Sequence, residues 1–83
     1  MKIYPNPSRS TSYISIPAEL VAECNLTVTN NHGEKVYEQT YTDVQTSLIS
    51  LDMSNYPVGL YKVTVGNDVR HESKDLLLIA GKN

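Results

Sequence analysis

The stretch Tyr56-Pro57-Val58-Gly59-Leu60-Tyr61-Lys62-Val63-Thr64-Val65 decides the fold of this chain. It begins with a turn signal, because Pro57 fixes φ and Gly59 accepts backbone conformations that a Cβ atom disfavours. From Leu60 onward the residues alternate between two faces, one with Tyr61, Val63 and Val65 and the other with Leu60, Lys62 and Thr64. A period of two predicts a β-strand with one buried face, and we interpret this stretch as a central strand.

Tyr61 follows the turn at the position of a tyrosine corner, in which a phenol hydroxyl bonds back to the main chain upstream. We predict that the Tyr61 hydroxyl makes this bond. The alternative is a core tyrosine that follows an ordinary turn. With either interpretation, no catalytic group lies near this strand.

Turn residues divide the rest of the chain into further short strands. The predicted strands are residues 3–4, 13–16, 24–29, 35–41, 46–53 and 69–79, in addition to 60–65. Residues 30–33 and 66–68 are expected to form hairpin loops, Gly33 taking the left-handed conformation, and 17–23 a loop with room for one helical turn. The chain thus has about seven short strands with turn signals at intervals of roughly 8–12 residues. This pattern predicts an immunoglobulin-like antiparallel β-sandwich. A small barrel is the alternative.

Alternation also predicts which side chains form the core. The expected inward residues are Ile14 and Ile16 before Pro17, Cys24 in register with Leu26 and Val28, and Ile49, Leu51 and Met53. The pair of prolines in Pro5-Asn6-Pro7 is expected to keep the backbone extended. Strand 35–41 is polar enough to have a solvated face.

Length and charge limit what the chain does. Its 83 residues make one domain, 1–83, near the lower end of what folds alone. A net charge of −2 with interspersed signs argues against nucleic-acid binding, which requires a basic stripe. No secretory apolar region and no transmembrane run is visible. Because Met1 starts directly on a strand, we expect a domain cut from a longer protein.

The sequence offers no constellation for catalysis, metal binding or a cofactor. His32 lies in a turn and His71 on a strand, without metal-ligand spacing around them. Cys24 occupies a core register, whereas a reactive thiol belongs in an exposed, electropositive setting. Tyr37 and Tyr41 share a strand face and could stack on a sugar, or simply cover their cross-strand neighbours. We therefore expect a protein that is not an enzyme.

The last strand breaks the alternation. In Ser73-Lys74-Asp75-Leu76-Leu77-Leu78-Ile79-Ala80 five apolar residues follow one another and occupy both faces. Either the strand is buried on both sides, or one face is an apolar strip that awaits a partner. We predict that Leu77 and Ile79 point inward and that Leu76 and Leu78 are more exposed.

Four motifs taken together resemble a known family. They are Ile3-Tyr4-Pro5-Asn6-Pro7-Ser8, Asn31-His32-Gly33-Glu34-Lys35-Val36-Tyr37, Val58-Gly59-Leu60-Tyr61-Lys62-Val63, and Lys74 before Leu76-Leu77-Leu78. Their order and spacing are similar to the C-terminal sorting domains of the type IX (Por) secretion system of Bacteroidetes. The similarity covers nearly the whole chain. The Tyr-Pro-Asn-Pro-Ser head with Gly-x-Tyr some fifty residues later is its most specific part.

The resemblance implies a non-catalytic cargo address with an immunoglobulin-like fold. It implies export through the periplasm to the outer-membrane surface or the medium, recognition by the type IX translocon, and cleavage in many members by a sortase-like cysteine protease. By position, Gly59 and Tyr61 match the Gly-x-Tyr element, and Pro5, Asn6 and Pro7 match the head motif. Lys74 and the residues Leu76, Leu77, Leu78 and Ile79 match the terminal element associated with recognition.

The chain departs from the family pattern at two places. Arg9, Ser10 and Thr11 stand where a glycine is frequent, and residues 80–83 extend beyond the last apolar strand. A second immunoglobulin-like family with Gly-x-x-Val-Tyr and Gly-x-Tyr patterns is a rival. The alternative function is an accessory or adhesion module that binds a protein or a glycan.

For the sorting function, an apolar terminal strand at a sheet edge suggests docking by strand addition. Deletion of residues 74–83 from a reporter fusion is then expected to abolish surface delivery.

Overall fold

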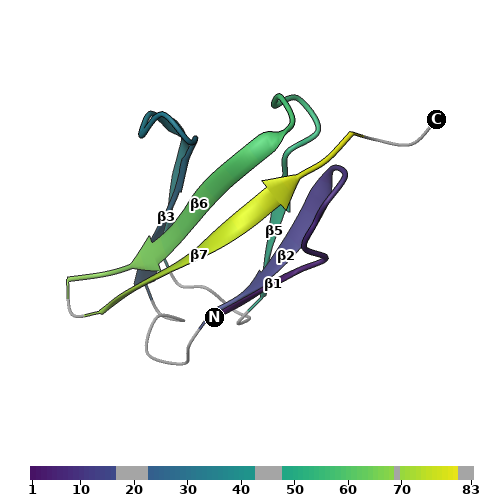
Figure 1. Ribbon diagram of the computed structural model, residues 1–83. Helices are drawn as coiled ribbons and strands as arrows, with labels where there is room; N and C mark the ends of the chain where they lie inside the picture. The colour runs from purple at the N-terminus through teal and green to yellow at the C-terminus, as the bar shows by residue number, and fades with distance from the viewer. Residues whose placement is uncertain (17–22, 43–47, 69, 81–83) are drawn as a thin grey trace.

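The computed structural model describes residues 1–16, 23–42, 48–68 and 70–80, and these form seven antiparallel strands in two sheets (Figure 1). The strands are β1 Lys2–Tyr4, β2 Thr11–Ser15, β3 Glu23–Thr29, β4 Lys35–Thr42, β5 Leu48–Asp52, β6 Gly59–Gly66 and β7 His71–Leu78. The order is β1-β2-β5 in the small sheet and β4-β3-β6-β7 in the large one. The predicted central position of β6 is confirmed, since it pairs with β3 on one side and β7 on the other.

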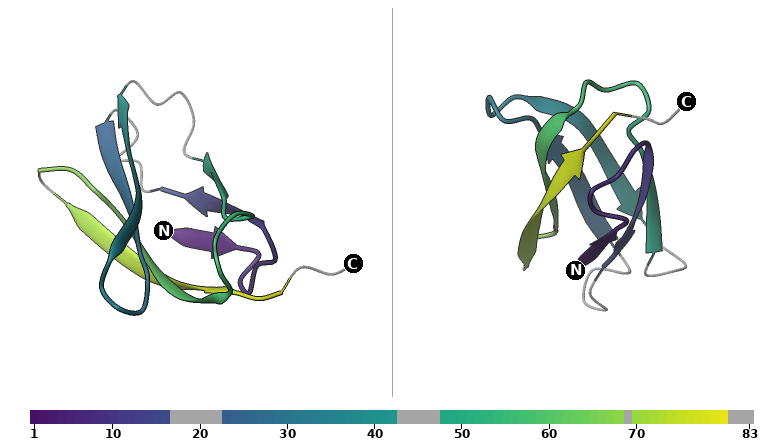
Figure 2. Two further views of the ribbon diagram at one scale, coloured as in Figure 1. Left: turned by 90° about the horizontal axis from the view of Figure 1, so that it is seen from above. Right: turned by 45° about the vertical axis from the view of Figure 1, so that its right-hand side comes forward.

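The two sheets form separate layers, as the view from above in Figure 2 shows. This arrangement confirms the immunoglobulin-like sandwich and excludes the barrel. In constant-type immunoglobulin domains the fourth strand lies in the sheet of the first, second and fifth strands. Here β4 pairs with β3 in the other, larger sheet. The described residues include no helix with the length and apolar character needed to cross a membrane.

The core is built from the predicted alternating side chains. It comprises Ile3, Ile14, Ile16, Cys24, Leu26, Val28, Ile49, Leu51, Met53, Tyr61, Val63, Val65, Leu76 and Leu78. Strict alternation on β3 and β5 puts every second residue in the core, and β4 has the predicted solvated face. All the inward positions predicted on the strands at 13–16, 24–29, 46–53 and 60–65 are therefore confirmed.

The hairpin loops are also where turn chemistry predicts them. Gly33 has φ +84°, the left-handed conformation expected of it. The main-chain N–H groups of His32 and Glu34 both donate to the Asn30 side-chain oxygen, which holds this loop together. The β6–β7 hairpin closes with the Asn67 N–H on the Arg70 carbonyl at 2.9 Å. Residues 17–22, 43–47 and 69 lie outside the described residues. They include Pro17, most of the loop expected at 17–23, and the first residues of the strands expected at 46–53 and 69–79.

Two expectations about the ends of the chain were wrong. Residues 5–7 form bends instead of an extended run, and the peptide bonds that precede both prolines are cis. On β7 the predicted facing is reversed: Leu76 and Leu78 are buried, Leu77 is 40% exposed, and Ile79 is half-buried.

The facing of β7 follows from its register with β6. Tyr61 pairs directly with Leu76, and directly opposite residues of antiparallel strands project to the same face. Because Tyr61 points into the core, Leu76 does too. The hairpin loop sets this register, and a shift of one residue would invert every side chain of the strand. A run of five apolar residues contains no pattern that specifies which alternative is correct.

Candidate functional site

The turn before β6 is a tyrosine corner, as predicted. The buried Tyr61 hydroxyl donates a hydrogen bond of 2.6 Å to the Pro57 carbonyl, four residues upstream. Gly59 lies between them with φ +151°, a conformation that side-chain-bearing residues rarely adopt. Tyr56 packs edge-on against the Tyr61 ring, with 6.4 Å between ring centroids. The Gly-x-Tyr element is therefore a structural device that fixes the start of β6.

The outer face of β6 and β7 carries exposed apolar side chains close to this corner. Leu60 and Leu77 are directly opposite each other on the two strands and are 46% and 40% exposed. Val58, two residues before Leu60, is 60% exposed. We call Val58, Leu60 and Leu77 the outer patch. Contiguous exposed apolar side chains mark candidate protein-binding surfaces, and the other sheet also exposes Tyr4, Tyr13 and Leu48.

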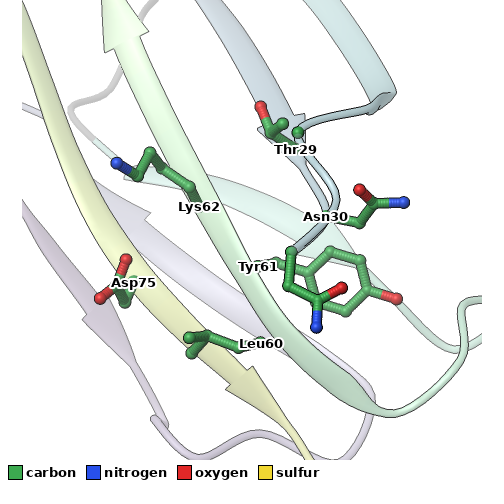
Figure 3. A pocket seen from close by; sticks show the side chains of 8 residues that line it. Thr29, Asn30, Leu60, Tyr61, Lys62 and Asp75 are labelled. Carbon is green, nitrogen blue, oxygen red and sulfur yellow. The ribbon is translucent and has the colours of Figure 1, made fainter.

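Next to the outer patch lies an open depression of about 400 Å³. Leu60, Lys62 and Asp75 line its floor on β6 and β7, and Thr29 and Asn30 of the β3–β4 hairpin form its far wall (Figure 3). Lys62 and Asp75 are a cross-strand pair of opposite charge, two positions along the ladder from Leu60 and Leu77 and on the same face of the sheet. The surface thus combines an apolar half with a polar, charged half.

The head of the chain is bound to the outward edge of β7. The Asn6 side chain donates from Nδ2 to the Asp75 carbonyl at 2.8 Å and accepts at Oδ1 from the Leu77 N–H at 3.0 Å. Two residues later the Ser8 N–H donates to the Leu77 carbonyl at 2.9 Å, and the Ile79 N–H donates to the Ser8 carbonyl at 2.8 Å. Ser8 is fully buried and forms a parallel bridge with Leu78. We call these contacts of Asn6 and Ser8 the head clasp.

The head clasp changes the interpretation of the β7 edge. N–H and C=O groups that face away from β6 are normally what an added strand pairs with. From the Asp75 carbonyl to the Ile79 N–H these groups are already bonded to Asn6 and Ser8. Strand addition there requires the head segment to leave first. The clasp was not foreseen from the sequence, because its bonds join residues about 70 positions apart.

The residues that the resemblance associates with recognition differ in how far they are buried. Tyr61, Leu76 and Leu78 are core residues, whereas Lys74 and Leu77 are exposed and Gly59 and Ile79 are half-buried. Pro5, Asn6 and Pro7 are all exposed. A partner that meets the folded domain can contact the exposed group only, so the buried group acts through the fold.

The cysteine, the tyrosine pair and the histidines considered in the sequence analysis lie where they do not form a reactive or binding site. Burial raises the pKa of the Cys24 thiol, which disfavours the nucleophilic thiolate. Tyr37 and Tyr41 pack partly buried against the core, opposite Val28 and Cys24, and burial raises the pKa of Tyr41. They cover cross-strand neighbours and do not form an exposed stacking platform. His32 and His71 are exposed, and no group of three metal-ligating side chains occurs in the described part of the chain.

Comparison with known proteins concerns the chain as a whole and singles out no surface. No curated protein matches the chain significantly. Residues 2–79 match the family described as "Secretion system C-terminal sorting domain". The match spans all seven strands, from β1 to the end of β7. The chain therefore belongs to this family of non-catalytic C-terminal sorting domains, which direct export by the Por (type IX) secretion system.

Proposed function

We propose that the folded domain is recognised by the type IX translocon through the outer patch and the exposed residues beside it. The observation that carries this proposal is the exposed Leu60–Leu77 cross-strand pair, which lies at the end of β7, the terminal element that the resemblance associates with recognition. Membership in the family implies contact with the secretion machinery, and a contact needs side chains that the machinery can reach. Leu76 and Leu78 are too buried to provide it.

The surface has the composition expected of a protein contact. Apolar side chains at the centre of an interface supply most of the binding free energy, and a polar rim supplies orientation. Here Val58, Leu60 and Leu77 are the apolar part, while Lys62 and Asp75 provide charges of both signs beside it. Lys74 is exposed on β7, but it pairs with the buried Val63 and so projects to the other face of the sheet, outside this surface.

The proposed sequence of events follows the family. The domain, carried behind its cargo, crosses the periplasm, meets the translocon at the outer membrane, and delivers the cargo to the cell surface or the medium. In many members of the family, a sortase-like cysteine protease removes the domain at that stage. The exposed head residues Pro5, Asn6 and Pro7 lie at the edge of β7 and are within the region such partners would approach.

Substitution of one side of the outer patch tests this function. In a secreted reporter that carries the whole chain at its C-terminus, Leu77→Ser and Leu60→Ser are each expected to lower surface delivery by roughly tenfold, the effect of about 1.4 kcal/mol of lost binding. Leu48→Ser is the matched control, because Leu48 is 41% exposed on the other sheet. Normal delivery of both patch variants would exclude this surface as the recognition site.

A further inference from the structure

The Asn6 amide reproduces the hydrogen bonds of a strand residue. A side-chain amide offers a donor and an acceptor, and a strand edge presents a carbonyl and an N–H in the complementary order. Only the orientation with Nδ2 on the Asp75 carbonyl and Oδ1 on the Leu77 N–H satisfies both bonds. Ser8 then continues the pairing with its own main chain. The head segment thus acts as a short parallel strand beside the end of β7.

The head clasp fixes Leu77 from one side while β6 holds its neighbours from the other. Both main-chain polar groups of Leu77 are bonded to the head segment, the N–H to Asn6 and the carbonyl to Ser8. The flanking residues Leu76 and Leu78 are paired with Tyr61 and Gly59. Leu77 lies near the end of the strand, where an uncovered edge would fray. With the clasp closed, its side chain has a defined position on the outer face.

We propose that Asn6 is a positioning residue for recognition: the head clasp keeps the β7 edge closed and presents Leu77 in a fixed position, so that the partner binds the outer patch and not the strand edge. This inference rests on the proposed function, since it assigns Asn6 a role in recognition by the same surface. It makes a prediction opposite to that of strand addition, for which loss of the clasp would free the edge and help binding.

Amide hydrogen exchange tests the structural step. In the isolated chain, Asn6→Ala is expected to raise the exchange rate of the Leu77 amide by about tenfold or more, because its acceptor is removed. The amides of Val63 and Val65, in the centre of the sheet, are expected to keep the wild-type rates and so report that the fold is intact. Asn6→Asp retains the acceptor for Leu77 and loses the donor to Asp75, so an intermediate increase is expected. An unchanged Leu77 rate in Asn6→Ala would overturn the proposal.

Surface delivery of the reporter tests the functional step. Asn6→Ala is expected to reduce delivery several-fold at a temperature where the variant is fully folded, and Asn55→Ala to leave it unchanged. Asn55 is an exposed turn residue whose side chain makes no hydrogen bond within the described residues. Delivery by Asn6→Ala equal to or above wild type, with the Leu77 amide released, would refute the positioning role and, if above, favour strand addition.

The outcomes for Leu77 and Asn6 separate the two proposals. If Leu77→Ser and Leu60→Ser are both delivered normally, the outer patch is not the recognition surface and the proposed function itself fails. If Leu77→Ser blocks delivery while Asn6→Ala does not, the proposed function stands and only the role of Asn6 fails. Loss of delivery in both, with a released Leu77 amide and protected Val63 and Val65 in Asn6→Ala, supports both.

Discussion

The two edge strands of the large sheet, β4 and β7, have equal length but are protected in different ways. On β4 the Val36 carbonyl accepts from the Tyr56 hydroxyl, and the Thr40 carbonyl accepts from the Gln39 side chain, each at 3.3 Å. On β7 the head clasp supplies four bonds of 2.8–3.0 Å. One edge is shielded by single side chains, and the other by a separate segment of the chain.

The difference follows from the residues that each edge carries. Lys35, Glu38 and Gln39 on β4 are exposed polar residues that discourage pairing with another chain. The end of β7 is apolar on both faces and lacks this protection. An exposed apolar edge strand is prone to aggregate or to pair with a strand of another chain unless another segment covers it. In this chain the head segment covers the apolar end of β7, so its main-chain groups are not open to another strand.

Truncation of one apolar side chain on each edge strand is expected to give the largest difference in the free energy of unfolding. Leu76→Ala, at a fully buried position on β7, should lower the free energy of unfolding by about 2–5 kcal/mol. Val36→Ala, at a half-buried position on β4, should cost about 1 kcal/mol. Urea unfolding midpoints measure both. Similar losses at the two positions would show that the β7 side contributes no more to the core than the β4 side.

Two tyrosine hydroxyls allow a second, smaller comparison. Tyr61→Phe removes the 2.6 Å bond to Pro57 at the start of β6, and we expect a loss of about 1–2 kcal/mol. Tyr56→Phe removes the 3.3 Å bond to Val36 on the β4 edge, and about 0.5 kcal/mol is expected because that bond is longer. Thermal or urea unfolding of the two variants checks the order. A greater loss in Tyr56→Phe would contradict it.

The smallest expected effect on stability comes from one carboxylate on each edge strand, and it depends on pH. Hydrogen bonds from Arg70 and the N-terminal ammonium lower the pKa of Glu72 on β7, and hydrogen bonds from Lys35 and Asn25 lower the pKa of Glu38 on β4. A carboxylate whose pKa is lowered by folding stabilises the native state above its ordinary pKa, and this contribution disappears as pH falls through the folded value. Both contributions are therefore present at pH 7 and decline below about pH 4.5.

Glu72→Gln and Glu38→Gln test this electrostatic contribution at each edge. Each variant is expected to unfold slightly more easily than wild type at neutral pH and to converge with wild type in acid, where the native carboxyls are protonated. Both differences should shrink in high salt, because exposed charges are screened. Urea midpoints measured between pH 7 and pH 3 provide the measurement. A difference that persists in acid would point to packing instead of charge.

Much of the fold could be predicted from local pattern. Alternation on the strands at 24–29, 46–53 and 60–65 specified the inward side chains, since one buried face leaves a period of two in the sequence. The Pro-x-Gly turn before Tyr61 predicted the corner, and Gly33 predicted the left-handed loop residue. The motifs of the head and the terminal strand indicated the sorting family.

Two features of the candidate site depended on tertiary structure. The facing of Leu76 to Ile79 was wrongly predicted, because in an unbroken apolar run only pairing with β6 selects the buried face. The head clasp unites Asn6 and Ser8 with Asp75, Leu77 and Ile79, which no local rule connects. The sequence alone determined the strands, the core side chains of the alternating strands and the family, because each is recorded in short-range pattern. Pairing with β6 decided which leucine is displayed, and contacts between the two ends of the chain decided which edge is closed.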